Sequence, residues 1–359
     1  MAPSGRSRIN IQQVADRAGV APSSVSRVLS GHPNVSDVMR NRVVDAVAAL
    51  GYEPDLLAQS LRRGASMTVG FVVGDISNPL LSEIALGAET GLRQSGYTML
   101  LANSMDNPNL DTSHIRLFAQ RRVDGLLLSV SDETSDSTLD VLTKAKLPCV
   151  MVDRELPKGD NVSAVLTDHE AGLSAAVTHL VELGHRRIAL VNGNPRVRPG
   201  RERATTLRRC ARRLGIAGAV RSGSFTTTHG EEAMNALLDE GEPPTAVIAG
   251  SNQILVGVLR CLRRRKCSVP DDISLVTCDQ IALSEFIDPP LATIERDPYL
   301  MGSLAAKLLL ERIGGGSARR AWVTTTFRST PSCAPPREPA YRRSVATGDP
   351  VGGYAATRG

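Results

Sequence analysis

The stretch VADRAGVAPSSVSRVLSG, residues 14–31, contains two short helical segments separated by a turn at Gly19. Asn10 and Gln13 have the spacing of a capping box before the first segment, and the glycine ends it. Pro22 begins the second segment, where its fixed φ favours a helix start. Two short helices joined by a turn that contains glycine are typical of a helix-turn-helix.

The second helical segment has two chemically different faces. Its predicted inward face is apolar and consists of Val25, Val28 and Leu29. The opposite face carries Ser23, Ser26 and Arg27, which lie three and four residues apart. Small hydroxyl groups and one guanidinium suit a helix that lies against the edges of DNA bases, because a bulky side chain would clash there. A solvated helix face is the alternative interpretation of the same pattern.

A third helical segment begins after Ser36 and ends before Gly51, and GYEPDLLAQSLRRG, residues 51–64, follows it. Pro54 interrupts the chain and Asp55 can cap a new short helix that is rich in leucine. Such a short helix is marginal in isolation. We expect it to fold when two copies meet on DNA, with leucines inserted between base steps from the minor groove.

From residue 68 onward, apolar strands alternate with segments of helix length. This order is the signature of parallel α/β sheets. The predicted strands cover residues 68–75, 97–103, 123–130, 148–153, 187–193, 245–250 and 272–278. They form two groups, one on each side of about residue 168.

The composition is that of an ordinary globular protein. The chain has 359 residues, 42% of them hydrophobic, and a formal net charge of +5, which permits a nucleic-acid partner without requiring one. Its six cysteines have no metal-ligand spacing, so we expect neither a metal nor a cofactor. No apolar run is long enough to cross a bilayer and no secretory signal is recognisable, so we expect no membrane partner and a cytoplasmic, nucleoid-associated location.

The segment NIQQVADRAGVAPSSVSRVLSGHPNV and several later motifs resemble the LacI/GalR (lactose-repressor/galactose-repressor) family of bacterial transcriptional regulators. The later motifs include TVGFVVGDISNPLLSEIALGAETGLRQSGY, HLVELGHRRIALVNG and VPDDISLVTCDQIALSEFIDPPLATI, and the resemblance covers about residues 9–333. It implies an N-terminal all-α helix-turn-helix domain with a hinge helix, followed by a two-lobed, periplasmic-binding-protein-like α/β effector domain with two parallel-sheet subdomains.

The resemblance also implies the order of the domains along the chain. Their expected boundaries are a flexible N-terminus (1–8), the helix-turn-helix domain (9–53), the hinge helix and linker (54–66), the two-lobed effector-binding and dimerisation domain (67–330) and a disordered tail (331–359). Within the effector domain, lobe 1 is expected to comprise about 67–167 and 296–330, and lobe 2 about 168–295.

The resemblance assigns DNA contacts to specific residues. Pro22, Ser23 and Arg27, with the neighbouring Ser26, would face the major groove, and Asn34 would lie near the DNA backbone. Leu61 would enter the minor groove, helped by Ala58. The chain departs from the family at Ala21, where a serine or threonine is usual, and at Asp55, where asparagine is usual. The expected partner is double-stranded operator DNA, bound by a homodimer at a pseudo-palindromic site.

Ligands of parallel α/β sheets bind outside the carboxyl ends of the strands. Side chains at those ends are therefore our candidates for effector binding, and the resemblance points most firmly to three of them, Arg203, Asn252 and Asp279. The candidates are Asp75, Asn78, Asp153, Arg198, Arg203, Phe225, Asn252 and Asp279. Asp75 and Asn78 could instead cap the following helix, and Phe225 could belong to the core.

Polar groups of these kinds are what recognition of a sugar requires. Residues 196–213 contain eight arginines and one glutamate. Arg196, Arg198 and Arg201 lie in the loop that opens this segment, and they could bind a sugar acid or a sugar phosphate. The arginines farther along fit a solvated helix face. The expected effector is therefore a sugar, sugar acid or sugar phosphate.

The sequence disfavours two other functions. An enzyme is disfavoured because the sequence lacks nucleophile, zinc-protease, P-loop and dinucleotide motifs. A periplasmic solute receptor would share the two lobes but would not need the N-terminal helices. The sequence therefore favours a DNA-binding transcriptional regulator, most simply a repressor, whose operator affinity depends on a small-molecule effector.

Overall fold

The computed structural model describes residues 9–30, 32–52, 64–156, 162–280 and 286–337. The chain forms two compact units, residues 1–66 and 67–359. The predicted flexible N-terminus, most of the predicted hinge helix, and residues 338–359 of the predicted tail lie outside the described residues.

The first unit contains three helices, α1 (Ile11–Ala18), α2 (Pro22–Leu29) and α3 (Asp37–Leu50), within its described residues. Asn10 and Gln13 form the predicted capping box, and Ser36 caps α3 by accepting a hydrogen bond from the Met39 amide. The three helices enclose a small core of Val14, Ala15, Ala18, Val25, Val28, Val43 and Ala46. This domain therefore has the helix-turn-helix arrangement that its sequence predicts.

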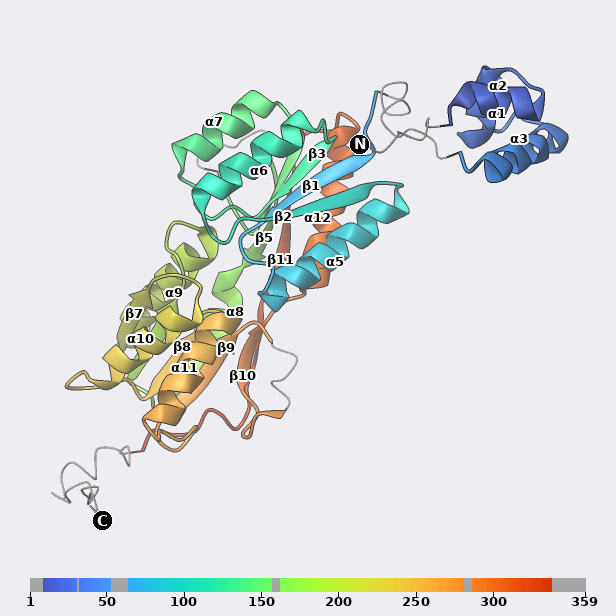
Figure 1. Cartoon of the computed structure of the whole chain (residues 1–359). Helices are drawn as coiled ribbons and strands as arrows, with labels where there is room; N and C mark the ends of the chain where they lie inside the picture. Colours follow the sequence, from blue (N-terminus) through green and yellow to red (C-terminus); the bar gives the residue numbers. More distant parts are fainter. Residues whose placement is uncertain (1–8, 31, 53–63, 157–161, 281–285, 338–359) are drawn as a thin grey trace, which may run out of the picture. The chain divides into compact units, whose positions relative to one another are not determined.

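The second unit contains two six-stranded sheets, one in each lobe. Lobe 1 has the strand order β11-β5-β4-β3-β1-β2, and all of its strand pairs are parallel. Its strands are β1 (Thr68–Val73), β2 (Thr98–Asn103), β3 (Gly125–Leu128), β4 (Cys149–Val152), β5 (Ser163–Asp168) and β11 (Arg320–Thr324). Its helices are α5 (Pro79–Gln94), α6 (Pro108–Gln120), α7 (Asp136–Ala145) and α12 (Pro298–Ile313). Helices α5 and α12 lie side by side on one face of the sheet, and α6 and α7 cover the other (Figure 1).

Lobe 2 has the order β12-β10-β9-β8-β6-β7. Its strands are β6 (Arg187–Asn192), β7 (Ala217–Ser222), β8 (Ala246–Ala249), β9 (Ser274–Cys278), β10 (Ala292–Glu295) and β12 (Thr326–Arg328). Its helices are α8 (His169–Glu182), α9 (Arg198–Leu214), α10 (Thr227–Leu238) and α11 (Asn252–Arg264). The helices cover both faces of this sheet as well: Val247 of β8 packs with α10 and α11, and its neighbour Ile248 packs with α8 and α9.

The predicted division into two parallel-sheet lobes is confirmed, but the boundary near the C-terminus is wrong. Residues 326–328 form β12, which pairs antiparallel with β10 and so completes lobe 2 rather than lobe 1. The predicted disordered tail also begins too early. The Ser332 hydroxyl donates to the Leu275 carbonyl and accepts from the Ala292 amide, and the Ala334 carbonyl bonds to His185, so this segment is fixed against lobe 2.

The chain passes between the lobes three times in its described part, after β5, after β10 and after β11. Because the strands within each sheet are almost all parallel, their carboxyl ends gather at one edge, and polar loops follow them there. Among the described helices, none is long and apolar enough to span a bilayer.

Candidate functional site

Helix α2 presents the polar face that its sequence predicts. Ser23 and Arg27 are exposed, while Val25 and Val28 are buried on the opposite side. Pro22 and Ser26 are half-buried at the edges of this polar face. The helix therefore offers small groups and one guanidinium on a surface that is not needed for its own packing.

The start of α2 is unusual. Ala21 occupies the N-cap position and has no side-chain oxygen with which to cap the helix, and Pro22 follows at the first helical position. Asn34, the predicted backbone contact, is exposed in the segment between α2 and α3. The two predicted minor-groove residues, Ala58 and Leu61, lie outside the described residues.

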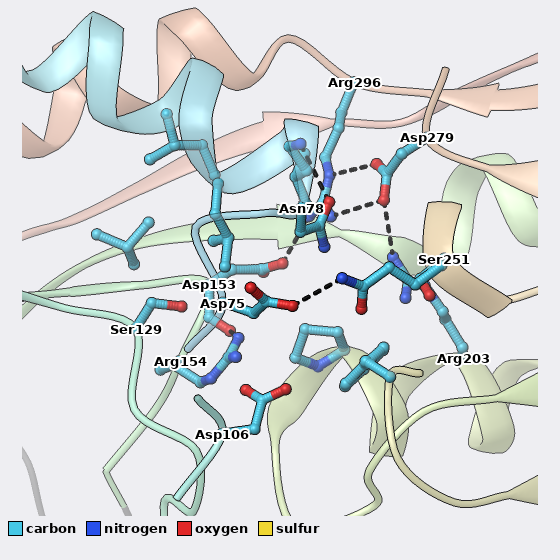
Figure 2. Close-up of a pocket in the computed structure, with 17 residues that line it drawn as sticks. Asp75, Asn78, Asp106, Ser129, Asp153, Arg154, Arg203, Ser251, Asp279 and Arg296 are labelled. Atoms are coloured by element: carbon cyan, nitrogen blue, oxygen red, sulfur yellow. Dashed lines mark hydrogen bonds and ion pairs between the residues drawn. The ribbon is translucent and has the colours of Figure 1, made fainter. Parts of the chain in front are cut away.

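In the second unit, a cavity lies between the lobes and is partly open to solvent (Figure 2). Both lobes contribute to its wall. Lobe 1 supplies Asp75 and Asp153, and lobe 2 supplies Arg203 and Asp279. The candidates that the structure brings together here are Asp75, Asn78, Asp153, Arg203, Phe225 and Asp279.

Two candidates are placed elsewhere. Asn252 is buried at the start of α11 and does not line the cavity, whereas its chain neighbours Ser251 and Gln253 do. The cavity-facing and buried positions alternate here because α11 begins at Asn252. Ser251 caps the helix by accepting a hydrogen bond from the Ile254 amide. Arg198 is also buried outside the cavity, where it donates to the Thr167 carbonyl at 2.6 Å and lies 5.1 Å from the ring centre of Trp322.

Arg296, which follows β10, connects the two candidate carboxylates at the back of the cavity. Its Nη1 donates to Asp153 Oδ2 at 2.5 Å, and its Nε donates to Asp279 Oδ1 at 2.8 Å (Figure 2). All three side chains are less than a tenth exposed. Burial would lower the pKa of Arg296, but Asp279 and Asp153 outweigh it and raise that pKa, so the guanidinium stays charged. Asp153 and Asp279 are thus bound mainly by the protein itself.

His169, the first residue of α8, contacts the same carboxylate. Its Nε2 lies 3.2 Å from Asp153 Oδ2 and both groups are buried. Burial lowers the pKa of His169 to about 4, although Asp153 opposes the shift, so the imidazole is neutral near pH 7. Burial would raise the pKa of Asp153, but His169 and Arg296 outweigh it and hold that pKa well below its ordinary value.

Asp75, at the end of β1, connects the lobes at the front of the cavity. Its Oδ2 accepts a hydrogen bond from Gln253 Nε2 of lobe 2 at 2.7 Å, and its Oδ1 accepts one from the Ser77 amide. These bonds outweigh the effect of burial and lower the pKa of Asp75. Asn78, the neighbouring candidate, caps α5 by accepting from the Leu80 amide while it also lines the cavity.

Ser129, Arg154 and Asp106 complete the polar wall of lobe 1 (Figure 2). Arg154 is fixed by hydrogen bonds from its Nε to the Val130 carbonyl and from its Nη1 to the Asp153 carbonyl. Asp106 lies over Gly74, where a Cβ atom would be only 2.3 Å from Asp106 Oδ1. Burial raises the pKa of Asp106, and Arg154 opposes this shift.

Phe225 lines the cavity from lobe 2 and packs directly on the backbone of Gly193. A Cβ atom at position 193 would be 2.0 Å from the Phe225 ring, so only glycine allows this position of the ring. Phe225 also packs against the core of lobe 2, so it belongs to both the core and the cavity wall.

The arginines that could have bound an anion instead join the lobes, and the prediction that all of them lie in a loop is wrong, because α9 begins at Arg198 and contains Arg201. Arg196 Nη1 donates to Asp132 of lobe 1 at 2.8 Å, and Arg201 forms an ion pair of 2.7 Å with Glu133. Glu133 also accepts a hydrogen bond from the Arg198 amide at 2.7 Å, at the start of α9. The guanidinium groups of Arg196 and Arg201 are therefore used in this structure to hold lobe 2 against lobe 1.

Six polar residues that line the cavity were not among the predicted binding residues, and most of them have a recognisable signal. They are Asp106, Ser129, Arg154, Ser251, Gln253 and Arg296. Asp106, Ser129 and Arg296 follow the carboxyl ends of β2, β3 and β10, the rule that identified Asp75 and Asp153. Gln253 follows the predicted Asn252 in the sequence. Which of the two side chains lines the cavity depends on the residue at which α11 begins.

Each of the two units contains a segment that matches a known protein family. Residues 10–55 match the family of bacterial regulatory proteins of the lacI family, and residues 177–330 match the periplasmic binding protein-like domain. The HTH-type transcriptional repressor PurR of Haemophilus influenzae (strain PittEE) is 32% identical over 309 residues, which are 84% of this chain and 90% of that protein.

Solved structures show the same similarity over the whole fold. The lac repressor dimer bound to operator and the anti-inducer ONPF has a TM-score of 0.81 and 25% identity, over 91% of this chain and 100% of that one. The complex of the transcriptional regulator CelR with cellobiose has a TM-score of 0.69 and 31% identity, over 90% of this chain and 100% of that one. The chain belongs to the lacI family of bacterial regulatory proteins.

Proposed function

We propose that this protein is a transcriptional repressor whose affinity for operator DNA is controlled by a small polyhydroxylated ligand bound between the lobes of its second unit. The observation that carries the proposal is the cavity, whose polar wall comes from both lobes. A ligand that contacts Asp75 on one side and Gln253 on the other must change the free energy of the hydrogen bond that joins them. Binding is thereby coupled to the relative position of the lobes.

The DNA-binding surface in this proposal is the polar face of α2. A single helix-turn-helix contacts few base pairs, so a two-fold dimer that contacts two half-sites is the expected form. Apolar side chains on α5, β2 and the start of α12 support a dimer, because they are exposed in the single chain and could be covered by a second copy. They are Leu86, Leu100, Leu101, Tyr299 and Leu300.

A sugar is the ligand class that best matches the cavity. Carboxylates, amides and guanidinium groups satisfy the hydroxyl groups of a sugar, and Phe225 offers an apolar surface to its ring. One structural neighbour was solved with the disaccharide cellobiose. A sugar that favours the lobe arrangement of the DNA-bound protein strengthens operator binding, and one that favours another arrangement releases the protein from DNA.

A mobility-shift assay tests the proposal directly. Full-length protein is titrated against DNA from the region around its own gene and against a scrambled fragment, with and without each member of a sugar panel. We expect sequence-specific binding that at least one ligand changes by about tenfold or more, the range of ordinary allosteric coupling. Binding that does not distinguish the two fragments would contradict the DNA-binding part. Specific binding that no ligand changes would contradict control by an effector.

A further inference from the structure

The charges around the cavity are not balanced. Among the described residues that line it, four carboxylates face three guanidinium groups. Arg296 is bonded to Asp153 and to Asp279, and Arg203 lies 3.8 Å from Asp279. Arg198, which is buried outside the cavity, lies 3.6 Å from Asp153, so Asp153 and Asp279 are compensated by cations of the protein itself. The excess negative charge therefore lies at Asp75 and Asp106, and among the described residues that line the cavity Arg154 is the remaining cation.

The two front carboxylates lack strong partners of their own. Asp75 is bonded by the neutral side chain of Gln253 and by the Ser77 amide. Within the described part of the chain, neither Asp75 nor Asp106 forms an ion pair, and Arg154 directs its Nε and Nη1 toward backbone carbonyls. Carboxylates that face a cavity without such partners are available to a ligand.

The Ser129 hydroxyl gives independent support for a ligand at this end. Ser129 is 1% exposed and lines the cavity, with its oxygen directed toward the space beside Asp75 and Arg154 (Figure 2). Among the described residues, no hydrogen-bond partner lies within reach of this oxygen. A buried hydroxyl group without a partner costs free energy, so a polar ligand that bonds to it gains more than it would at an exposed serine.

We infer that the effector carries a single ammonium group beside its hydroxyl groups, as an amino sugar does, and that Asp75, Asp106 and Ser129 bind this part of it. The inference rests on the proposed function, since it names the ligand class of the same cavity. The ammonium group supplies the missing positive charge and up to three donors, and its partners are two carboxylates and one hydroxyl oxygen. A sugar acid or sugar phosphate would bring its negative charge against Asp75 and Asp106, while Arg196 and Arg201 are already used between the lobes.

Calorimetric titration of matched ligands tests this inference. The probes are D-glucosamine and D-galactosamine, their neutral parents D-glucose and D-galactose, their N-acetyl derivatives, and the anions D-gluconate and D-glucose 6-phosphate. We expect at least one amino sugar to bind about tenfold or more tightly than its parent and its N-acetyl derivative, because a hydrogen bond between charged groups is stronger than one between neutral groups. Raising the pH through the pKa of the ligand's amine should remove this advantage without changing the affinity for the neutral parent.

Two variants identify the groups responsible. Asp106→Asn keeps the size of the side chain and should remove most of the amino-sugar preference, measured as the ratio of the affinities for the amino sugar and its neutral parent. Asp140→Asn is the matched control, since Asp140 is an exposed carboxylate of lobe 1 that pairs with Lys144 on its own helix. Circular dichroism and melting temperature of both variants establish that each is folded.

The outcomes separate this inference from the proposed function. Tightest binding of a neutral or anionic probe, or no binding of any amino sugar, would overturn the inference. An unchanged preference in Asp106→Asn would overturn the assigned contact. If a neutral or anionic probe alters operator binding, the effector-controlled repressor stands while the ammonium ligand does not.

Discussion

Helix α2 and the cavity between the lobes use similar residue types in opposite ways. Ser23 and Arg27 on α2 are exposed, and neither side chain forms an ion pair with another of the residues that the structure describes. In the cavity, Asp153, Asp279 and Arg296 are buried and bonded to one another across the two lobes. A polar side chain at a binding surface can therefore be available to a partner or already bonded within the fold, and its contacts distinguish the two.

The largest expected effect comes from Arg296, which is bonded to two buried carboxylates. Arg296→Gln leaves the carboxylates of Asp153 and Asp279 buried without their shared cation, so the second unit should lose about 3–5 kcal/mol of unfolding free energy in urea denaturation. Arg319→Gln removes an exposed arginine that pairs with Glu311, and should cost under about 1 kcal/mol. A loss as small in Arg296→Gln as in the control would mean that the cluster does not hold the lobes together.

The buried His169 makes the stability of the same cluster depend on pH. The folded pKa of about 4 lies below the ordinary 6.5, so the unfolded chain binds a proton between these values and the folded chain does not. Stability from this group is complete above about pH 6.5 and should fall by roughly 3 kcal/mol as the pH decreases toward 4.

Urea titrations of the wild type and His169→Gln at pH 7, 5.5 and 4.5 measure this dependence. The variant lacks the titrating imidazole and should lose less stability across this range. Parallel pH curves for the two proteins would show that His169 is not the group responsible.

Substitutions on the exposed polar face of α2 should change DNA binding without changing folding stability. Arg27→Ala should weaken specific operator binding by about 1–3 kcal/mol, the value of one good base contact, with the melting temperature unchanged. Arg208→Ala removes an exposed arginine of α9 and should change neither quantity. Loss of folding stability in Arg27→Ala would break the comparison, because it would show that this face of α2 is also needed by the fold.

The smallest expected effect concerns the start of α2. Ala21→Ser adds the missing capping oxygen and should stabilise the first unit by about 1 kcal/mol. The change is measured by thermal unfolding of the full chain, with Ala48→Ser, which places a serine inside α3 rather than at a cap, as the comparison variant. Equal effects of the two substitutions on stability would show that a side-chain oxygen at the N-cap of α2 does not stabilise this helix.

The sequence was sufficient for the parts of the molecule that depend on local periodicity. The three helices of the first unit and the polar face of α2 follow from spacing along one segment, and the alternation of strands and helices predicts both lobes. The prediction that residues 326–328 belong to lobe 1 was wrong, because three residues carry no periodicity of their own and β12 is defined by its pairing with β10.

The cavity was predicted only in outline, because its residues come from separate segments. The rule for strand ends brought Asp75, Asp153 and Asp279 to the right place. It could not show that Arg296 already binds two of them, since that contact joins positions 143 and 17 residues apart. Asn252 does not line the cavity for a different reason, since a shift of one position at a helix start exchanges a cavity wall for a buried site.

Coupling between the cavity and the DNA is the central claim, and linkage makes it measurable in one experiment. The ligand that binds most tightly is titrated by calorimetry into the free protein and into its complex with operator DNA. The account predicts dissociation constants that differ by at least about fivefold, with the same factor when DNA is titrated into free and ligand-saturated protein. Equal dissociation constants for the free protein and the DNA complex would contradict control of operator binding by the cavity.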